Sequence, residues 1–245
     1  MSSKTLRKGV ILAGGKASRL VPLTKVTNKH LLPVGRYPMI YWPLDALIQC
    51  GVNNIMVTTG IDHLDSIVRV LGSGRDFGVR FTYRVQDEAG GIAQALGLCE
   101  DFVGQDDVMV ILGDNIYAGN LNPYMNSFTT GARIVLQPRN DPERFGVAIV
   151  EGEKVVKIIE KPKVPPSNLV VTGCYLYDHR VFDIIKSLKP SGRGELEITD
   201  VNNAYIGMGE LTYNTIDVPW TDAGTFESLY EANKIVHGMK VSFDK

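Results

Sequence analysis

The chain has 245 residues, of which 44% are hydrophobic and 22% charged, and its formal net charge is −1. These values are those of an ordinary globular protein with one sizeable core or two small ones. A charge so close to zero gives no global field that would recruit nucleic acid or an anionic membrane, and no apolar stretch approaches the roughly 18 residues that span a bilayer. We therefore expect neither partner, and any bound polyanion must meet a local cluster of basic residues.

Strand and helix patterns alternate along the first half of the chain. Apolar runs predict strands at 9–13, 54–60, 79–86 and 107–114, and helical spacing of apolar residues predicts helices at 38–51, 62–74 and 91–104. Strands that are separated by helices imply a mostly parallel sheet with helices on both faces.

The second half of the chain has a mixed pattern. It predicts two short strands joined by a turn at 146–162, a helix at 194–209, a strand at 211–218 and a last helix at 225–238. The proline-rich stretch 161–168 favours an extended surface loop. We expect one α/β domain over residues 1–245, with a smaller mixed sub-region after about residue 140.

The cysteine and histidine patterns indicate a reducing compartment and no metal held by histidine. Cys50, Cys99 and Cys174 are far apart and odd in number, which predicts reduced thiols rather than a disulfide or zinc set. The four histidines show no HxxxH or HExxH pattern. The basic start MSSKTLRKG is followed by an apolar run too short for a signal peptide, so we expect a cytoplasmic enzyme.

The loop after the first predicted strand has two interpretations. Ligands bind beyond the carboxyl ends of strands in open parallel sheets. There, Gly14 and Gly15 permit close backbone approach, and Arg19 and Lys29 could neutralise phosphate charge. The pattern is neither GxGxxG nor GxxxxGK[ST], so a phosphate-binding loop and an ordinary strand-to-helix turn are equally good interpretations of the glycines alone.

Two aspartates also follow predicted strands. Asp114 ends a fully apolar run and Asp222 lies between a strand and a helix, where carboxylates could hold Mg²⁺ against a ligand's phosphates. The alternatives are an Asx turn for Asp114 and a helix cap for Asp222, a role for which Thr225 is a rival. Lys161, Arg193 and Gln86 are further polar residues near strand ends or in loops, and each taken alone is typical of a solvated surface.

Taken together, these segments closely resemble the sugar-nucleotide pyrophosphorylases, and among them the short form of the glucose-1-phosphate thymidylyltransferases. The matching stretches occur in the family's order from residue 8 to about 241: KGVILAGG with SRL, NKHLLPVGRYPMIYWPL, VQDEAGGIAQAL, ILGDNIY, NDPERFGV, IEKP, VTGCYLYD, GRGELEITDVN and WTDAGT. The resemblance implies a Rossmann-like three-layer nucleotidyltransferase fold, with a mostly parallel, mixed sheet. Its nucleotide-binding part would be about 1–140 and its sugar-phosphate-binding part about 141–245.

The resemblance also implies Mg²⁺ as cofactor, dTTP and glucose 1-phosphate as substrates, and a homo-oligomer. Nucleotide-binding residues would be Leu12, Gly14, Gly15, Arg19, Gln86, Gly91 and Asp114; substrate-binding residues would be Asn115, Gly146, Glu160, Lys161, Gly173 and Arg193. Arg19, Lys29, Lys161 and Arg193 would be catalytic, and Asp114 and Asp222 would ligate Mg²⁺. Alternatives are the same chemistry with UTP or another sugar 1-phosphate, or a sensor that binds nucleotide sugars without turnover.

The sequence departs from the family in two places. Ala17 stands where the family usually has glycine; a positive φ there would cost about 1–2 kcal/mol, whereas a negative φ would make alanine harmless. Longer members continue with helices that help to form an effector site and a subunit contact, whereas this sequence ends at Lys245. We expect effector regulation of that kind to be missing or rebuilt.

Overall fold

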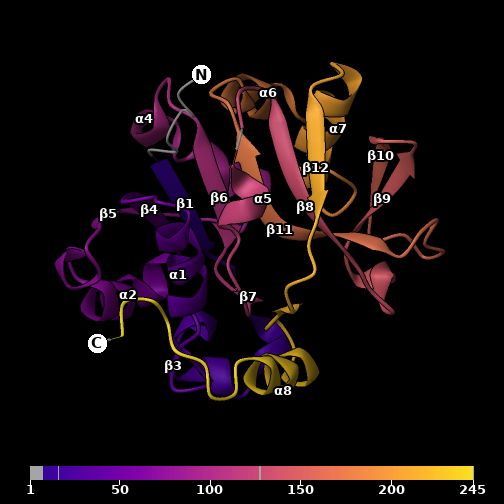
Figure 1. Cartoon of the computed structure of the whole chain (residues 1–245). Helices are drawn as coiled ribbons and strands as arrows, with labels where there is room; N and C mark the ends of the chain where they lie inside the picture. The colour runs from indigo at the N-terminus through magenta and orange to yellow at the C-terminus, as the bar shows by residue number, and fades with distance from the viewer. Residues whose placement is uncertain (1–7, 16, 127, 245) are drawn as a thin grey trace.

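The computed structural model describes residues 8–15, 17–126 and 128–244, and the basic start considered above as a leader lies outside them at residues 1–7. Within the described ranges, nine strands form one mixed sheet in the order β10-β9-β11-β6-β1-β4-β5, with β8 pairing β11 and β12 (Figure 1). The bounds of these strands are β1 Lys8–Ala13, β4 Asn54–Thr59, β5 Arg80–Val85, β6 Val108–Leu112, β8 Ala132–Pro138, β9 Gly146–Glu151, β10 Lys154–Glu160, β11 Leu169–Tyr177 and β12 Leu211–Thr215.

Strand β1 lies at the centre of the parallel part of the sheet. It pairs in parallel with β4 and with β6, and Leu12 is level with Thr58 on one side and with Leu112 on the other. The strand β5 extends the parallel part beyond β4, whereas β11 runs antiparallel to β6, β8 and β9. The loops that follow β1 and β6 therefore leave the sheet at the same edge, side by side.

Helices cover both faces of the sheet, because successive residues of the buried strands point to opposite sides. Val10 and Leu12 pack with one set of helices, and Ile11 and Ala13 pack with the other. The first set is α3 (Ile92–Gly97), α4 (Glu100–Val103), α6 (Val181–Ser187) and α7 (Ile198–Gly207); the second is α1 (Tyr41–Gln49), α2 (Leu64–Leu71) and α5 (Asn122–Met125). Three layers result.

Two small ribbons and a last helix complete the structure (Figure 1). Strands β7 (Asn115–Tyr117) and β13 (Trp220–Asp222) pair antiparallel, as do β2 (Pro33–Val34) and β3 (Tyr37–Pro38). Helix α8 (Phe226–Ile235) packs over them through a third apolar cluster. Short 3-10 turns lie at Ser18–Leu20, Leu23–Lys25, Lys29–Leu31, Ile61–His63, Arg75–Phe77 and Pro142–Arg144.

The α/β fold and every predicted strand are confirmed, and several details differ, among them helices α5 and α6 and the short strands β2, β3, β7 and β13, which were not predicted. The helix predicted at 91–104 is two short helices, α3 and α4, and strands β8 and β11 were not predicted. Asp222 ends a strand of the β7–β13 ribbon rather than of the main sheet. The division near residue 140 stays a prediction.

The described part of the chain contains no helix long and apolar enough to cross a membrane. Its three cysteines are free and buried.

Candidate active site

Two adjoining cavities lie at the edge of the sheet where β1 and β6 end. The Gln86 cavity is lined by Leu12, Gly14, Gly15, Lys29, Gln86, Ala89, Gly91, Ile92, Ala95, Leu112, Asp114 and Glu195. The Glu160 cavity is lined by Arg19, Ile92, Leu112, Asp114, Asn115, Arg144, Phe145, Gly146, Glu160, Lys161, Val171, Gly173, Tyr175, Ile198, Thr199, Asn202, Trp220 and Asp222. Because both linings include Ile92, Leu112 and Asp114, the two cavities meet at these residues.

The loop after β1 brings backbone close to the Gln86 cavity. A Cβ added to Gly14 would lie 2.1 Å from Oε1 of Gln86, so a larger residue there would displace the amide of Gln86. Gly15 has φ +95°, and Ala17 has φ +47° and ψ +35°, the left-handed conformation. The question that the sequence left open at Ala17 is therefore answered: alanine occupies a backbone conformation that favours glycine.

Asp114 lies at the junction of the cavities with a lysine against it. Lys29 Nζ donates to Oδ2 of Asp114 at 2.5 Å, and Asn115 Nδ2 donates to Oδ1 at 3.1 Å. Burial by itself would raise the pKa of the Asp114 carboxyl, but the Lys29 charge and these hydrogen bonds hold the pKa well below its usual range. Asp114 is therefore ionised at neutral pH and can act as a ligand for a cation.

Asp222 lies across from Asp114 and is held by an arginine. Arg144 Nη2 donates to both carboxylate oxygens of Asp222, at 2.8 and 3.0 Å. Burial and the nearby charge of Asp114 raise the pKa of Asp222, and Arg144 and Arg19 oppose that rise. The helix-cap alternative for Asp222 is wrong, because Thr225 caps α8 with a reciprocal hydrogen-bond pair to Ser228.

Asn115 is oriented by the β7–β13 ribbon. Its Oδ1 accepts a hydrogen bond from Trp220 Nε1 at 2.7 Å, while its Nδ2 faces Asp114. Gly173, in β11, makes room for this arrangement, since a Cβ there would lie 3.0 Å from Asn115 Oδ1 and the residue has φ +58°. The amide is thus fixed on one side of the Glu160 cavity.

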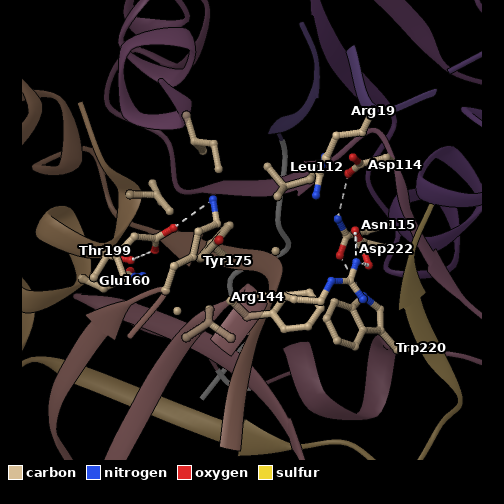
Figure 2. A pocket seen from close by; sticks show the side chains of 18 residues that line it. Arg19, Leu112, Asp114, Asn115, Arg144, Glu160, Tyr175, Thr199, Trp220 and Asp222 are labelled. Carbon is tan, nitrogen blue, oxygen red and sulfur yellow. Dashed lines mark hydrogen bonds and ion pairs between the residues drawn. The ribbon is translucent and has the colours of Figure 1, made fainter. Parts of the chain in front are cut away.

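The end of the Glu160 cavity that lies away from Asp114 combines a carboxylate with hydroxyl groups (Figure 2). Thr199 Oγ1 donates to Oε2 of Glu160 at 2.6 Å, and Tyr175 lies beside them, opposite the end that holds Asp114, Asn115 and Asp222. Lys161 Nζ lies 3.4 Å from Oε1 of Glu160, and its backbone has φ +43°. A carboxylate with a hydroxyl and an ammonium group suits a polyhydroxylated ligand that carries a negative charge.

Arg193 lies outside the two linings. Its guanidinium pairs with Glu197 at 2.8 Å and reaches Glu160 at 3.4 Å. Burial would lower the pKa of Arg193, but hydrogen bonds and charges from Glu197 and Glu160 raise it. Its predicted contact with a sugar phosphate stays a prediction, because in this arrangement carboxylates occupy the guanidinium.

The remaining predicted residues all line one cavity or both. Leu12, Gly14, Gly15, Lys29, Gln86 and Gly91 line the Gln86 cavity, Asp114 lines both, and Arg19, Asn115, Gly146, Glu160, Lys161, Gly173 and Asp222 line the Glu160 cavity. Sequence reasoning missed Arg144, Thr199, Tyr175 and Trp220. All four lie in stretches that carried the resemblance, NDPERFGV, GRGELEITDVN, VTGCYLYD and WTDAGT, but no pattern assigned them a contact.

The two aspartates are candidate donors for a hard divalent cation. Burial raises the pKa of Asp222, and the charge of Asp114 adds to that rise, which places the two carboxylates within electrostatic reach of each other. Carboxylate oxygens at such a junction fit Mg²⁺, which takes one or two protein carboxylates together with ligand phosphates and water.

Comparisons with known proteins show the family of this chain. The family model for nucleotidyl transferases matches residues 8–238. A glucose-1-phosphate thymidylyltransferase from Neisseria meningitidis is 44% identical over 236 residues, 94% of this chain and 82% of the relative. A Bacillus anthracis crystal structure, provisionally assigned as a glucose-1-phosphate thymidylyltransferase and solved with sucrose, is 59% identical, covers 96% of each chain and has a TM-score of 0.92. UDP-glucose pyrophosphorylase with UDP-glucose, at 22% identity and a TM-score of 0.84, shares the fold.

Proposed function

The chain belongs to the nucleotidyl transferase family, and from this premise we propose that it makes dTDP-glucose and pyrophosphate from dTTP and glucose 1-phosphate with Mg²⁺. One observation carries the proposal: Asp114 lies where the Gln86 cavity joins the Glu160 cavity, and Asp222, on the wall of the Glu160 cavity, is close enough for the charge of Asp114 to act on it. A nucleoside triphosphate in the first cavity and a sugar phosphate in the second would bring their phosphates together at these carboxylates.

The reaction needs charge neutralisation more than proton transfer. A phosphomonoester has a second pKa near 6, so the sugar phosphate arrives mostly as a dianion and needs no general base. Bringing it against a triphosphate costs roughly 4 kcal/mol per charge pair at 4 Å and an effective dielectric constant near 20. Bound Mg²⁺ would supply part of the compensating charge.

The protein supplies the rest of the positive charge from both sides of the junction. Lys29 lies against Asp114, Arg19 and Arg144 lie near Asp222, and Lys161 reaches in from the other end of the cavity. In-line attack of the sugar phosphate on the α-phosphorus then expels pyrophosphate, and catalysis comes from positioning and charge stabilisation. Arg193 would join them after leaving its carboxylate partners.

The two ends of the site divide recognition between them. Gln86 offers an acceptor and a donor in one plane, which matches N3–H and an adjacent carbonyl of thymine or uracil. Glu160 and Thr199 offer hydrogen bonds to sugar hydroxyls. We propose the same division for the chain, with the nucleotide bound mainly by residues about 1–140 and the sugar phosphate mainly by about 141–245. The homo-oligomer and the cytoplasmic location stay predictions.

A pyrophosphate-release assay tests the proposal. It compares dTTP, UTP and CTP with glucose 1-phosphate, then other sugar 1-phosphates with dTTP, each with and without Mg²⁺. We expect dTTP with glucose 1-phosphate to give the highest kcat/KM and no turnover without the metal. Turnover with dTTP no better than with CTP would refute the nucleotide assignment, and dTDP-glucose binding without turnover would favour a sensor.

Asp114→Asn separates a catalytic role from a structural one. It removes a charge from the proposed metal site, so turnover should fall far more than the melting temperature. Asp101→Asn is the matched control, because the Asp101 side chain is 91% exposed and lies on α4 outside both linings. If Asp114→Asn lost its activity only to the extent that its lower melting temperature leaves less protein folded, the residue would be structural.

A further inference from the structure

We propose that Gln94 determines base specificity by holding the amide of Gln86 in the orientation that accepts thymine or uracil and rejects cytosine. The inference rests on the proposed function, because it needs a pyrimidine in the Gln86 cavity. It assigns a role to a residue that lines neither cavity.

Gln86 is held by hydrogen bonds both at its backbone and at the end of its side chain. The residue follows β5 and is 7% exposed, and its backbone N–H donates to the Thr59 carbonyl at 2.9 Å. At the end of the side chain, Nε2 donates to Oε1 of Gln94 at 2.7 Å. The carbonyl oxygen Oε1 lies against Gly14, whose added Cβ would be 2.1 Å away. The acceptor therefore faces the glycine loop, and the donor faces Gln94.

Gln94 is itself held in the first turn of α3. Its side chain folds over Gly90, since a Cβ added there would lie 3.0 Å from Cγ of Gln94. The turn is tied to a distant segment, because Ala93 N–H donates to the Leu196 carbonyl at 3.1 Å and Leu196 N–H donates to the Gly90 carbonyl at 2.8 Å. Gly91 has φ +103° and no space for a side chain against Leu196. The group that positions Gln86 is thus part of a well-anchored turn.

The orientation of an amide decides which pyrimidine it can read. Thymine and uracil present N3–H, a donor, beside a carbonyl, whereas cytosine presents N3, an acceptor, beside an amino group. An amide that turns over freely matches either pattern. With one N–H of Gln86 given to Gln94, the second N–H and the carbonyl oxygen are left for the base, in the arrangement that matches thymine. Turning Gln86 over while Gln94 keeps its amide orientation would set the Gln86 carbonyl oxygen against Oε1 of Gln94, two acceptors at hydrogen-bond distance.

Two variants of Gln94 separate positioning from packing. Gln94 is also an amide, so Gln94→Glu makes it an acceptor only and keeps Gln86 in the thymine-reading orientation. Gln94→Met keeps the length of the side chain and removes the acceptor. Gln105→Met is the matched control, because Gln105 is exposed and lies in the α4–β6 connection. A negative charge at position 94 acts on both nucleotides alike. The ratio of kcat/KM for dTTP to kcat/KM for dCTP therefore reports the orientation of the Gln86 amide alone.

The experiment measures kcat/KM for dTTP and for dCTP with glucose 1-phosphate and Mg²⁺, and equilibrium binding of the two nucleotides. We expect the dTTP preference to fall about five- to tenfold in Gln94→Met, mainly through KM and nucleotide affinity, since one hydrogen bond is lost. Gln94→Glu and Gln105→Met should keep the wild-type preference within about twofold. Melting temperatures check that each variant is folded.

Three outcomes would overturn the inference. Gln94→Met that keeps the wild-type preference would show that Gln86 needs no positioning partner. If Gln94→Glu lost about fivefold or more of the dTTP preference, packing and not the acceptor would matter. This result is judged against the wild-type enzyme, so it decides the question even if Gln94→Met fails to fold. A wild-type enzyme with no preference for dTTP over dCTP would refute the proposed nucleotide as well, which distinguishes that failure from the first two.

Discussion

Ala17→Gly should stabilise the protein, although glycine usually destabilises. Ala17 has φ +47° and ψ +35° at the start of the Ser18–Leu20 turn. Its carbonyl accepts hydrogen bonds from Leu20 N–H at 3.1 Å and from Thr24 Oγ1 at 3.0 Å. These contacts hold the left-handed conformation in place, so alanine cannot relax without losing them.

The expected gain follows from two opposing terms. Alanine in the left-handed region lies about 1–2 kcal/mol above its relaxed conformation, and glycine removes that energy. Glycine also increases the freedom of the unfolded chain, which favours unfolding by about 0.4–1 kcal/mol. The net change in the free energy of unfolding is a gain of up to about 1.6 kcal/mol, or a rise in Tm of up to roughly 6 °C for a chain of this size.

Urea unfolding and thermal denaturation of both proteins test this value. Ala118→Gly is the matched control, because Ala118 has no positive φ and retains its N–H bond to the Pro219 carbonyl at 2.8 Å. It should lose about 0.4–1 kcal/mol through the unfolded-state term alone. If Ala17→Gly is destabilised as much as Ala118→Gly, the strain assigned to Ala17 does not exist.

Three other perturbations give distinct readouts. Gly14→Ala places a methyl group on Oε1 of Gln86, so KM for dTTP should rise about tenfold or more while Tm changes by only a few degrees; an unchanged KM would contradict the close approach. Burial lowers the pKa of His30 to about 3 from 6.5, so the unfolded chain binds one more proton below pH 6.5 and the free energy of unfolding falls as pH drops through that window. His30→Gln should flatten this slope by up to about 1.4 kcal/mol per pH unit in urea unfolding, and an unchanged slope would mean that His30 is not buried neutral. Arg144→Met removes a group that lowers the pKa of Asp222, so the acid limb of kcat/KM should move to higher pH; a fixed limb would show that Asp222 does not control it.

The first half of the sheet was predictable because its elements are visible in local patterns of the sequence. Each strand there is a short apolar run, and the helices between them carry their own spacing. β11 was missed although Leu169–Tyr177 is almost wholly apolar, because Thr172 and Gly173 interrupt the apolar run. The predicted helix at 91–104 breaks after Gly97, and the spacing of apolar residues does not predict that break.

The site was predictable where it depends on strand ends and unpredictable where it depends on distant side chains. The strand-end rule placed Asp114 correctly, and it brought Asp222 to the same edge even though that residue belongs to a separate ribbon. The pairing of Arg144 with Asp222 joins residues 78 positions apart, so no spacing could indicate it. The sign of φ at Ala17 also depends on hydrogen bonds to residues that follow it.

Backbone strain is concentrated in two segments, the loop that follows β1 and the residue that follows β10. Among the described residues, Ala17 and Lys161 are the two non-glycine residues with positive φ, at +47° and +43°. Lys161 N–H donates to the Phe145 carbonyl at 2.9 Å, which fixes the conformation that directs its ammonium group along the wall of the Glu160 cavity. Glycine at 161 would relieve the strain and remove the cation, whereas glycine at 17 would relieve it and remove only a methyl group. In the proposed mechanism, strain at 161 therefore accompanies a cation that the reaction uses, whereas strain at 17 can be removed without loss of any group to which the proposal gives a role.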